Sequence, residues 1–327
     1  MRDTSVSWQK VLAQGFSSSK ELLEFLDLPN ALDSSAAEKQ FKVRVPRGFA
    51  ARMQPGNARD PLLLQVLATN QEMQVINNYV ADPLEEKNVN PLQGFLHKYQ
   101  GRVLLTLTGV CAINCRYCFR RHFPYQENNP GRKGWDAVLD YIRQDSSIHE
   151  VILSGGDPLL AADSTLMALI PQLEAITHLR TLRFHTRVPV VLPERINQSF
   201  LTLLAGTRFR KVMVLHCNHA QEINEQVRDV CEALRASGCH LLNQAVLLKG
   251  INDDVQTLAN LSERLFDCGV LPYYLHVLDK VAGAAHFDMP VEEAQALYRQ
   301  LQQCLPGYLL PRLAREDAGG TSKTLLL

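Results

Sequence analysis

The feature that most constrains this chain is a regular alternation of short β-prone runs and helix-length amphipathic segments, which starts at about residue 99. The intervening segments are long enough for crossover helices, and such connections make neighbouring strands parallel. Six units of this kind suit an incomplete barrel or an open parallel sheet. The predicted strands are 103–109, 150–154, 181–187, 211–217, 241–248 and 271–278, and the predicted helices are 134–145, 163–176, 193–205, 219–237, 255–268 and 291–304.

We therefore predict an α/β fold, a partial (βα)6 TIM-like barrel with an N-terminal helical extension. Residues 1–98 form the extension in this prediction, because helical patterns occur around Val6 to Gln14 and Lys20 to Leu26. Residues 99–310 form the barrel, and residues 311–327 form a separate C-terminal segment.

The overall composition excludes several classes of partner. Lys plus Arg and Asp plus Glu each number 34, so the chain lacks the positive field of a nucleic-acid binder, and we predict no nucleic-acid partner. Apolar runs such as Val103 to Leu107 are far shorter than the roughly 20 residues of a membrane-spanning helix, so we predict no membrane partner. The N-terminus lacks the apolar core of a secretory signal, which predicts a cytoplasmic protein. A net charge of zero is compatible with a homo-oligomer.

Polar clusters follow five of the six predicted strands at their carboxyl ends. They are Cys111 to Cys118, Ser154 to Asp157, His185 to Arg187, His216 to His219, and Asp279 to Lys280. Loops at the carboxyl ends of parallel strands lie on the same side of the sheet and carry the chemistry of such folds. We therefore expect one active site there.

Cys111, Cys115 and Cys118 place three thiols within eight residues, which suits a soft metal or an iron–sulfur cluster. A cubane cluster held by three thiolates keeps one iron open for another ligand, as catalytic metal sites do. A zinc site is the alternative, but zinc would need a fourth ligand, for which His122 is the only near candidate.

The spacing Cys-x-x-x-Cys-x-x-Cys, with an aromatic residue before the last cysteine, resembles the signature of the radical S-adenosylmethionine superfamily. The resemblance implies a [4Fe-4S] cluster whose open iron binds S-adenosylmethionine, and an electron donor protein. Ser154, Gly155, Gly156 and Asp157 resemble the segment that receives the methionine amino group, and glycine backbone permits such close approach. A plain tight turn is the alternative for this segment.

More of the chain, from about residue 90 to residue 324, resembles the lysine 2,3-aminomutase family. The resemblance lies in Arg102 to Leu104, Cys118 to Arg121, Ser154 to Leu159, Asn243-Gln244, Pro272 to Leu275 and Gly319 to Thr324. It implies a bound pyridoxal 5′-phosphate, held as a Schiff base by Lys323 in the C-terminal segment, with Arg102 and Gln244 as further cofactor contacts. Without the resemblance, a lysine at this position would be interpreted as solvated.

The same resemblance implies that Arg120 binds the substrate carboxylate and that Asp279 and Glu316 bind the ε-ammonium of lysine. Glu316 differs from the aspartate of the clostridial enzymes and has Asp317 beside it. A solvated carboxylate is the alternative for each acid. The implied reaction converts L-lysine to (R)-β-lysine, with hydrogen abstraction by a 5′-deoxyadenosyl radical.

The chain also lacks, after Lys323, the cysteine-bearing tail of the clostridial enzymes, and in this it resembles the bacterial aminomutase that supplies β-lysine to translation elongation factor P. Two other functions stay open at this point. One is a radical aminomutase for another amino acid such as glutamate, although Asp279 and Glu316 would repel a side-chain carboxylate. The other is an iron–sulfur redox protein without a substrate.

Overall fold

The computed structural model describes residues 7–86, 91–125 and 131–326, and it contains one nine-stranded sheet whose strands follow each other in chain order. Strands β2 to β8 pair in parallel, while β1 and β9 are antiparallel to their neighbours at the two edges. The sheet is not closed into a complete barrel. The strands are β1 Phe95–Tyr99, β2 Arg102–Thr108, β3 Glu150–Gly155, β4 Thr181–Thr186, β5 Arg210–His216, β6 Cys239–Val246, β7 Leu271–His276, β8 Arg312–Arg315 and β9 Thr324–Leu325.

The predicted fold class is confirmed, and the six predicted strands are β2 to β7. Every residue of β3 is buried, as expected for a strand covered on both faces, whereas β4 alternates between buried and half-buried residues. The sequence analysis did not predict β1, β8 or β9. Strand β8 has only two buried residues between exposed arginines at its ends, so it lacks a strand-length apolar pattern.

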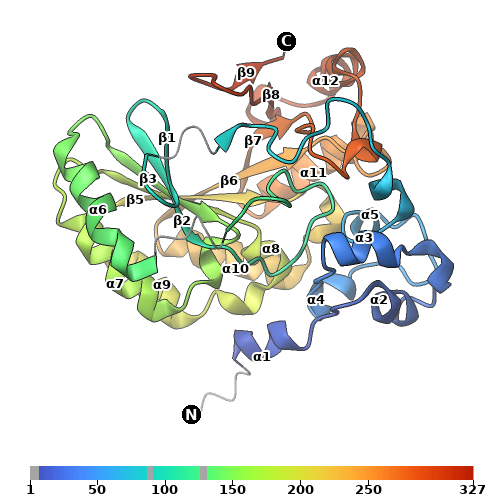
Figure 1. Cartoon of the computed structure of the whole chain (residues 1–327), viewed down its shortest axis with the longest axis horizontal. Coiled ribbons are helices and arrows are strands. Elements are labelled where there is room, and N and C mark those ends of the chain that lie inside the picture. The colour runs from blue at the N-terminus through green and yellow to red at the C-terminus, as the bar shows by residue number, and fades with distance from the viewer. Residues whose placement is uncertain (1–6, 87–90, 126–130, 327) are drawn as a thin grey trace.

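Crossover helices connect the parallel strands and lie along the sheet, with α6, α7, α9 and α10 together on one side of it (Figure 1). Side-chain caps fix where several of them start: Asn224 accepts from the Val227 amide at 3.1 Å, so α10 begins at Glu225 rather than at the predicted residue 219. The connecting helices are α6 Gly131–Gln144, α7 Asp163–Glu174, α8 Val188–Val191, α9 Gln198–Gly206, α10 Glu225–Ala236, α11 Val255–Asp267 and α12 Val291–Cys304.

The N-terminal part of the chain forms short helices that gather at one end of the molecule (Figure 1). Ser18, Ser34 and Asp60 cap three of them through their side chains. Their apolar residues, including Phe49, belong to the same core cluster as the barrel strands. The helices are α1 Trp8–Ala13, α2 Ser19–Phe25, α3 Ser35–Gln40, α4 Arg47–Ala50 and α5 Pro61–Leu64.

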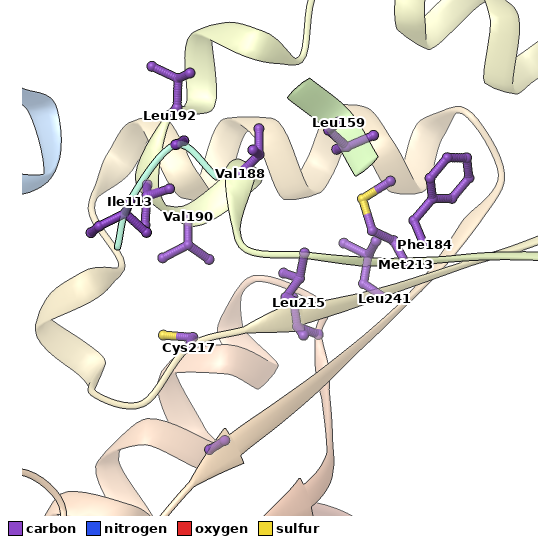
Figure 2. Packing of buried hydrophobic residues seen from close by; sticks show 14 of the residues in the cluster. Ile113, Leu159, Phe184, Val188, Val190, Leu192, Met213, Leu215, Cys217 and Leu241 are labelled. Carbon is purple, nitrogen blue, oxygen red and sulfur yellow. The ribbon is translucent and has the colours of Figure 1, made fainter. Parts of the chain in front are cut away.

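The core lies between the strands and the helices that cover them. Phe184, Met213 and Leu241 occupy neighbouring register positions on β4, β5 and β6, and Leu159 packs beside them (Figure 2). A continuous row of this kind holds three strands in one register, because a slip of one residue would turn every side chain to the other face. In the described part of the chain, no helix is both long and apolar enough to cross a bilayer.

Candidate active site

The loop that leaves β2 carries Cys111, Cys115 and Cys118, and all three thiols are half-buried. A tight turn brings the last two together, because the Cys118 amide donates to the Cys115 carbonyl at 3.0 Å. Burial and the neighbouring Cys115 raise the pKa of the Cys118 thiol to about 12, and burial followed by Cys118 raises the pKa of Cys111. The three thiols therefore lie in one environment.

The donor set fits a cluster better than a single ion. Within residues 7–86, 91–125 and 131–326, no three His, Cys, Asp or Glu side chains converge closely enough to hold one metal ion. A cubane cluster binds each thiolate through a different iron, so its sulfur ligands need not converge on one point. The imidazole Nε2 of His122, the candidate fourth zinc ligand, lies 3.1 Å from the Ala282 carbonyl oxygen.

A buried carboxylate clamps this cysteine loop to the N-terminal helices. Glu72 accepts from the Arg116 guanidinium at 2.8 and 2.5 Å and from Arg121 at 2.6 Å. The side chains of Arg116 and Glu72 are fully buried. Separation of these ion pairs would leave an uncompensated buried charge, so they are costly to break. They therefore hold the backbone of the loop between the cysteines in place. Glu72 belongs to none of the sequence motifs and was not predicted.

The glycine segment at the end of β3 packs directly against the start of the cysteine loop. The Gly156 amide donates to the Thr108 carbonyl at 2.7 Å, and a Cβ on Gly156 would lie 2.5 Å from the Val110 carbonyl oxygen. Gly155 has a φ of +116°, which side chains rarely adopt. The two glycines therefore permit the close contact of these loops, which is consistent with their predicted place beside S-adenosylmethionine.

Asp157, the last residue of that segment, uses its carboxylate within the protein. It accepts from the Thr186 hydroxyl at 2.6 Å, from the Arg187 amide at 2.7 Å, and from the Val188 and Leu159 amides at 3.1 Å. Burial raises the pKa of Asp157 to about 6 despite these bonds. Asp157 thus ties the end of β3 to the end of β4. A cofactor that contacts the Asp157 carboxylate, as predicted, would share the carboxylate oxygens with these hydroxyl and amide donors.

Arg120, the predicted carboxylate ligand, is buried beside the glycine segment. Its Nη1 lies 3.4 Å from the Ser154 hydroxyl and from the Gly155 carbonyl oxygen. Its Nε and Nη2 donate to Glu86 at 2.7 and 2.5 Å. The sequence analysis did not single out Glu86, which lies 34 residues away and belongs to none of the motifs.

Lys323 lies between the last two strands, where its amine donates to Glu316 at 2.5 Å. Glu316 also accepts from Lys98 and from the Tyr99 hydroxyl, both at 2.9 Å. Burial opposes ionisation of Glu316, but Lys323 and Lys98 outweigh it and hold its pKa below the ordinary value. Lys98 and Tyr99 belong to β1, so Glu316 joins the first strand of the open sheet to its last strands through side chains.

Asp279 follows β7 and faces the same group of charges. Burial, and then Glu316, raise its pKa to about 7, although Lys323 acts in the opposite direction. Burial, Arg183, Lys323 and Arg120 lower the pKa of His185 at the end of β4. The charge of Lys323 therefore contributes to the pKa shifts of both Asp279 and His185, and the charge of Arg120 contributes to the shift of His185.

The remaining predicted cofactor residues lie near partners of Glu316 and Lys323. The Arg102 guanidinium is 4.6 Å from the ring centroid of Tyr99, which bonds Glu316. Gln244 on β6 is half-buried and in register with Tyr274 on β7, and the Lys323 amine is 5.7 Å from the Tyr274 ring centroid.

Comparison with known proteins assigns the family. A family model described as the radical SAM superfamily matches residues 105–261, which include the cysteine loop and the glycine segment. An L-lysine 2,3-aminomutase of Haemophilus influenzae is 51% identical over 321 residues, which cover 98% of this chain and 95% of that protein. The chain belongs to the lysine 2,3-aminomutase family of radical SAM proteins.

Two further members of the family show how far the likeness extends. The L-lysine 2,3-aminomutase of Escherichia coli K12 is 48% identical, with 98% of this chain and 94% of that protein covered. The one from Clostridium subterminale is 32% identical, with 97% of this chain but only 77% of that protein covered. The comparisons thus confirm the family that the cysteine, glycine and lysine motifs predicted.

Proposed function

We propose that the protein is an isomerase that converts L-α-lysine to (R)-β-lysine by radical migration of the amino group. Relatives named L-lysine 2,3-aminomutase support the reaction class. The observation that carries the proposal is the bond between the Lys323 amine and Glu316, whose charges both act on Asp279, together with the buried Arg120 beside the glycine segment. A cation for a carboxylate and an acid for a distant ammonium match the two charged ends of free lysine.

Cys111, Cys115 and Cys118 would hold a [4Fe-4S] cluster, and the open iron would take S-adenosylmethionine beside Gly155 and Gly156. When bound, these two groups supply the radical that removes hydrogen from the substrate. The protein's part is to hold the cysteine loop rigid, through the clamp at Glu72, and to keep water from the loop by burying it against the N-terminal helices.

Lys323 would hold pyridoxal 5′-phosphate, with Arg102 and Gln244 as further contacts. When bound, this cofactor supplies a carbonyl carbon that binds the migrating nitrogen. Glu316 positions the Lys323 amine through a charge-assisted hydrogen bond. Lys98 and Tyr99 hold Glu316 in turn.

Arg120 would bind the carboxylate of lysine, and Asp279 would bind its ε-ammonium. Glu316 already accepts bonds from Lys323, Lys98 and Tyr99, so Asp279 is the acid with more capacity for an incoming cation. An approaching ammonium favours the ionised form of Asp279, which burial otherwise disfavours. Two acids at this end would repel the second carboxylate of glutamate, which argues against that alternative substrate.

We further propose a cytoplasmic role in which the product modifies translation elongation factor P, as the resemblance of the sequence to the bacterial aminomutase of that process implies. A reducing partner protein would supply the electron that the cluster needs, and a homo-oligomer agrees with the absence of net charge. A redox protein without a substrate would have no use for Lys323, Arg120 and Asp279.

The test is to reconstitute the enzyme anaerobically, reduce it, and supply L-lysine, S-adenosylmethionine and pyridoxal 5′-phosphate. Chiral chromatography should detect (R)-β-lysine from the wild type and none from Lys323→Ala or Cys115→Ala. Lys323→Ala should still cleave S-adenosylmethionine, whereas Cys115→Ala should not. Formation of 5′-deoxyadenosine by the wild type without β-lysine would retain the radical enzyme and exclude lysine as its substrate.

A further inference from the structure

In the part of the chain that the structure describes, a side-chain carboxylate holds the guanidinium of Arg120 along one edge. Glu86 accepts from Nε at 2.7 Å and from Nη2 at 2.5 Å, which is a side-on pair. Among residues 7–86, 91–125 and 131–326, the contacts of the other edge, which Nη1 shares with the second proton of Nη2, are two long ones of 3.4 Å with Ser154 and Gly155. An arginine presents its five N–H groups in a rigid planar fork, so a partner on one edge fixes the direction of the other.

This ion pair is buried but borders a cavity. The side chains of Arg120 and Glu86 are 9% and 10% exposed. Both residues line the same surface cavity, together with the rings of Phe119 and Phe123. The Arg120 guanidinium carbon lies 5.1 Å from the ring centroid of Phe119 and 5.7 Å from that of Phe123, so apolar faces further restrict its movement. Glu86 and the two rings therefore hold the Arg120 guanidinium in one orientation.

The segment that carries Glu86 is fastened to the loop that carries Asp279. The Val80 amide donates to the Lys280 carbonyl at 3.0 Å, and the Ala282 amide donates back to the Val80 carbonyl at 2.9 Å. The Glu86 amide donates to the Asp82 carboxylate at 3.2 Å, which closes the turn before Glu86. The negative charge of Glu86 also contributes to the raised pKa of Asp279. Glu86 thus contacts Arg120 at one end of the proposed lysine site, and its segment is bonded to the loop that carries Asp279 at the other end.

We propose that Glu86 is a positioning residue that fixes the plane of the Arg120 guanidinium and turns its open edge toward the substrate carboxylate. The inference rests on the proposed function, in which Arg120 binds that carboxylate. Nothing in the motifs of the chain assigns a role to Glu86. In this arrangement Arg120 bridges two carboxylates, one from the protein and one from the substrate.

In a competing arrangement, Glu86 would occupy the binding position of the substrate carboxylate and would move away when lysine binds. The geometry favours the positioning role for two reasons. First, Glu86 leaves free the edge of the Arg120 guanidinium that faces Ser154 and Gly155 at the end of β3. Second, if Glu86 moved away, the buried Arg120 would lose its counter-charge from the protein. The two arrangements predict opposite changes in the affinity for lysine when the charge of Glu86 is removed.

The experiment compares Glu86→Gln with Glu85→Gln, which makes the same chemical change at an exposed neighbour. Steady-state β-lysine formation gives KM and kcat, and equilibrium dialysis with labelled L-lysine gives Kd for the reconstituted, unreduced enzyme. Because an amide cannot accept both guanidinium bonds, Glu86→Gln should raise KM and Kd about tenfold or more and change kcat by less than about threefold. Glu85→Gln should match the wild type.

Glu86→Asp keeps the charge with a shorter reach, so its KM should lie between those of the wild type and Glu86→Gln. This variant guards against a folding defect, as does comparison of the cluster absorbance of each protein. An unchanged or lower KM in Glu86→Gln, with a wild type that forms β-lysine, would overturn the positioning role alone. A wild type that neither binds lysine nor forms β-lysine would overturn the proposed function and the inference with it.

Discussion

Replacement of Asp279 by asparagine should remove lysine turnover and at the same time stabilise the folded protein. Burial, and then Glu316, raise the pKa of Asp279 from its ordinary 3.8 to about 7. A carboxyl group whose pKa is higher in the folded chain than in the unfolded chain costs stability once it ionises. That cost is absent below pH 3.8, grows between the two pKa values, and is complete above about pH 7.

The two pKa values set the size of the effect. At about pH 8 the difference corresponds to up to about 4 kcal/mol, and at about pH 5 the same linkage leaves up to about 2 kcal/mol. Asp279→Asn removes the charge with little change in volume, so the variant should be more stable by up to these amounts. The gain should be larger at the higher pH.

Chemical unfolding of the wild type and the variant, followed anaerobically at both pH values without substrate, measures this difference. Asp229→Asn is the matched control, because Asp229 is exposed on α10 and its replacement should change the stability little at either pH. Two results would refute this reasoning: equal free energies of unfolding for Asp279→Asn and the wild type at about pH 8, or a gain that is the same at both pH values. Either result would mean that ionisation of Asp279 does not destabilise the folded protein.

Three further outcomes are expected. The value of kcat/KM for lysine should fall about tenfold for each pH unit below about 7, because the ammonium needs ionised Asp279, and a flat profile would contradict this. Gly156→Ala should lower the iron content per chain, because its Cβ would lie 2.5 Å from the Val110 carbonyl oxygen, whereas Gly206→Ala, which meets nothing within 4 Å, should retain iron. Glu72→Gln should destabilise the fold by about 3–5 kcal/mol, measured by chemical unfolding, because two buried arginines lose their shared partner.

The strands that the sequence predicted are those with enough apolar residues to show a pattern. Strands β2 to β7 each contain a run of apolar or β-branched residues, and their order followed from the helices between them. Strand β8 contains four residues and β9 contains two, so neither has a detectable period. Strand β8 forms because β7 offers an unpaired edge to the segment that follows α12, and β9 then pairs antiparallel with β8.

The candidate site was predicted from motifs, and the contacts between motifs were not. The cysteines, the glycine segment and Lys323 each have a local signature, so their positions could be assigned from short stretches of sequence. The partners Glu72 and Glu86 carry no signature, because a carboxylate that pairs with an arginine 44 or 34 residues away leaves no periodic trace. Glu316 was predicted to bind the ammonium of the substrate, and the ammonium groups that it contacts in the structure are those of Lys323 and Lys98.

The ion pairs that hold the cysteine loop and those that hold Lys323 join parts of the chain that are synthesised at different times. Glu316 lies 218 residues after Lys98, whereas Glu72 lies 44 residues before Arg116. Since chains emerge N-terminus first, the contacts that hold the cysteine loop can form well before residues 316 to 323 exist. A nascent or shortened chain that stops before residue 316 would therefore retain the clamp of the cluster loop and lack the amine on which the proposed reaction depends.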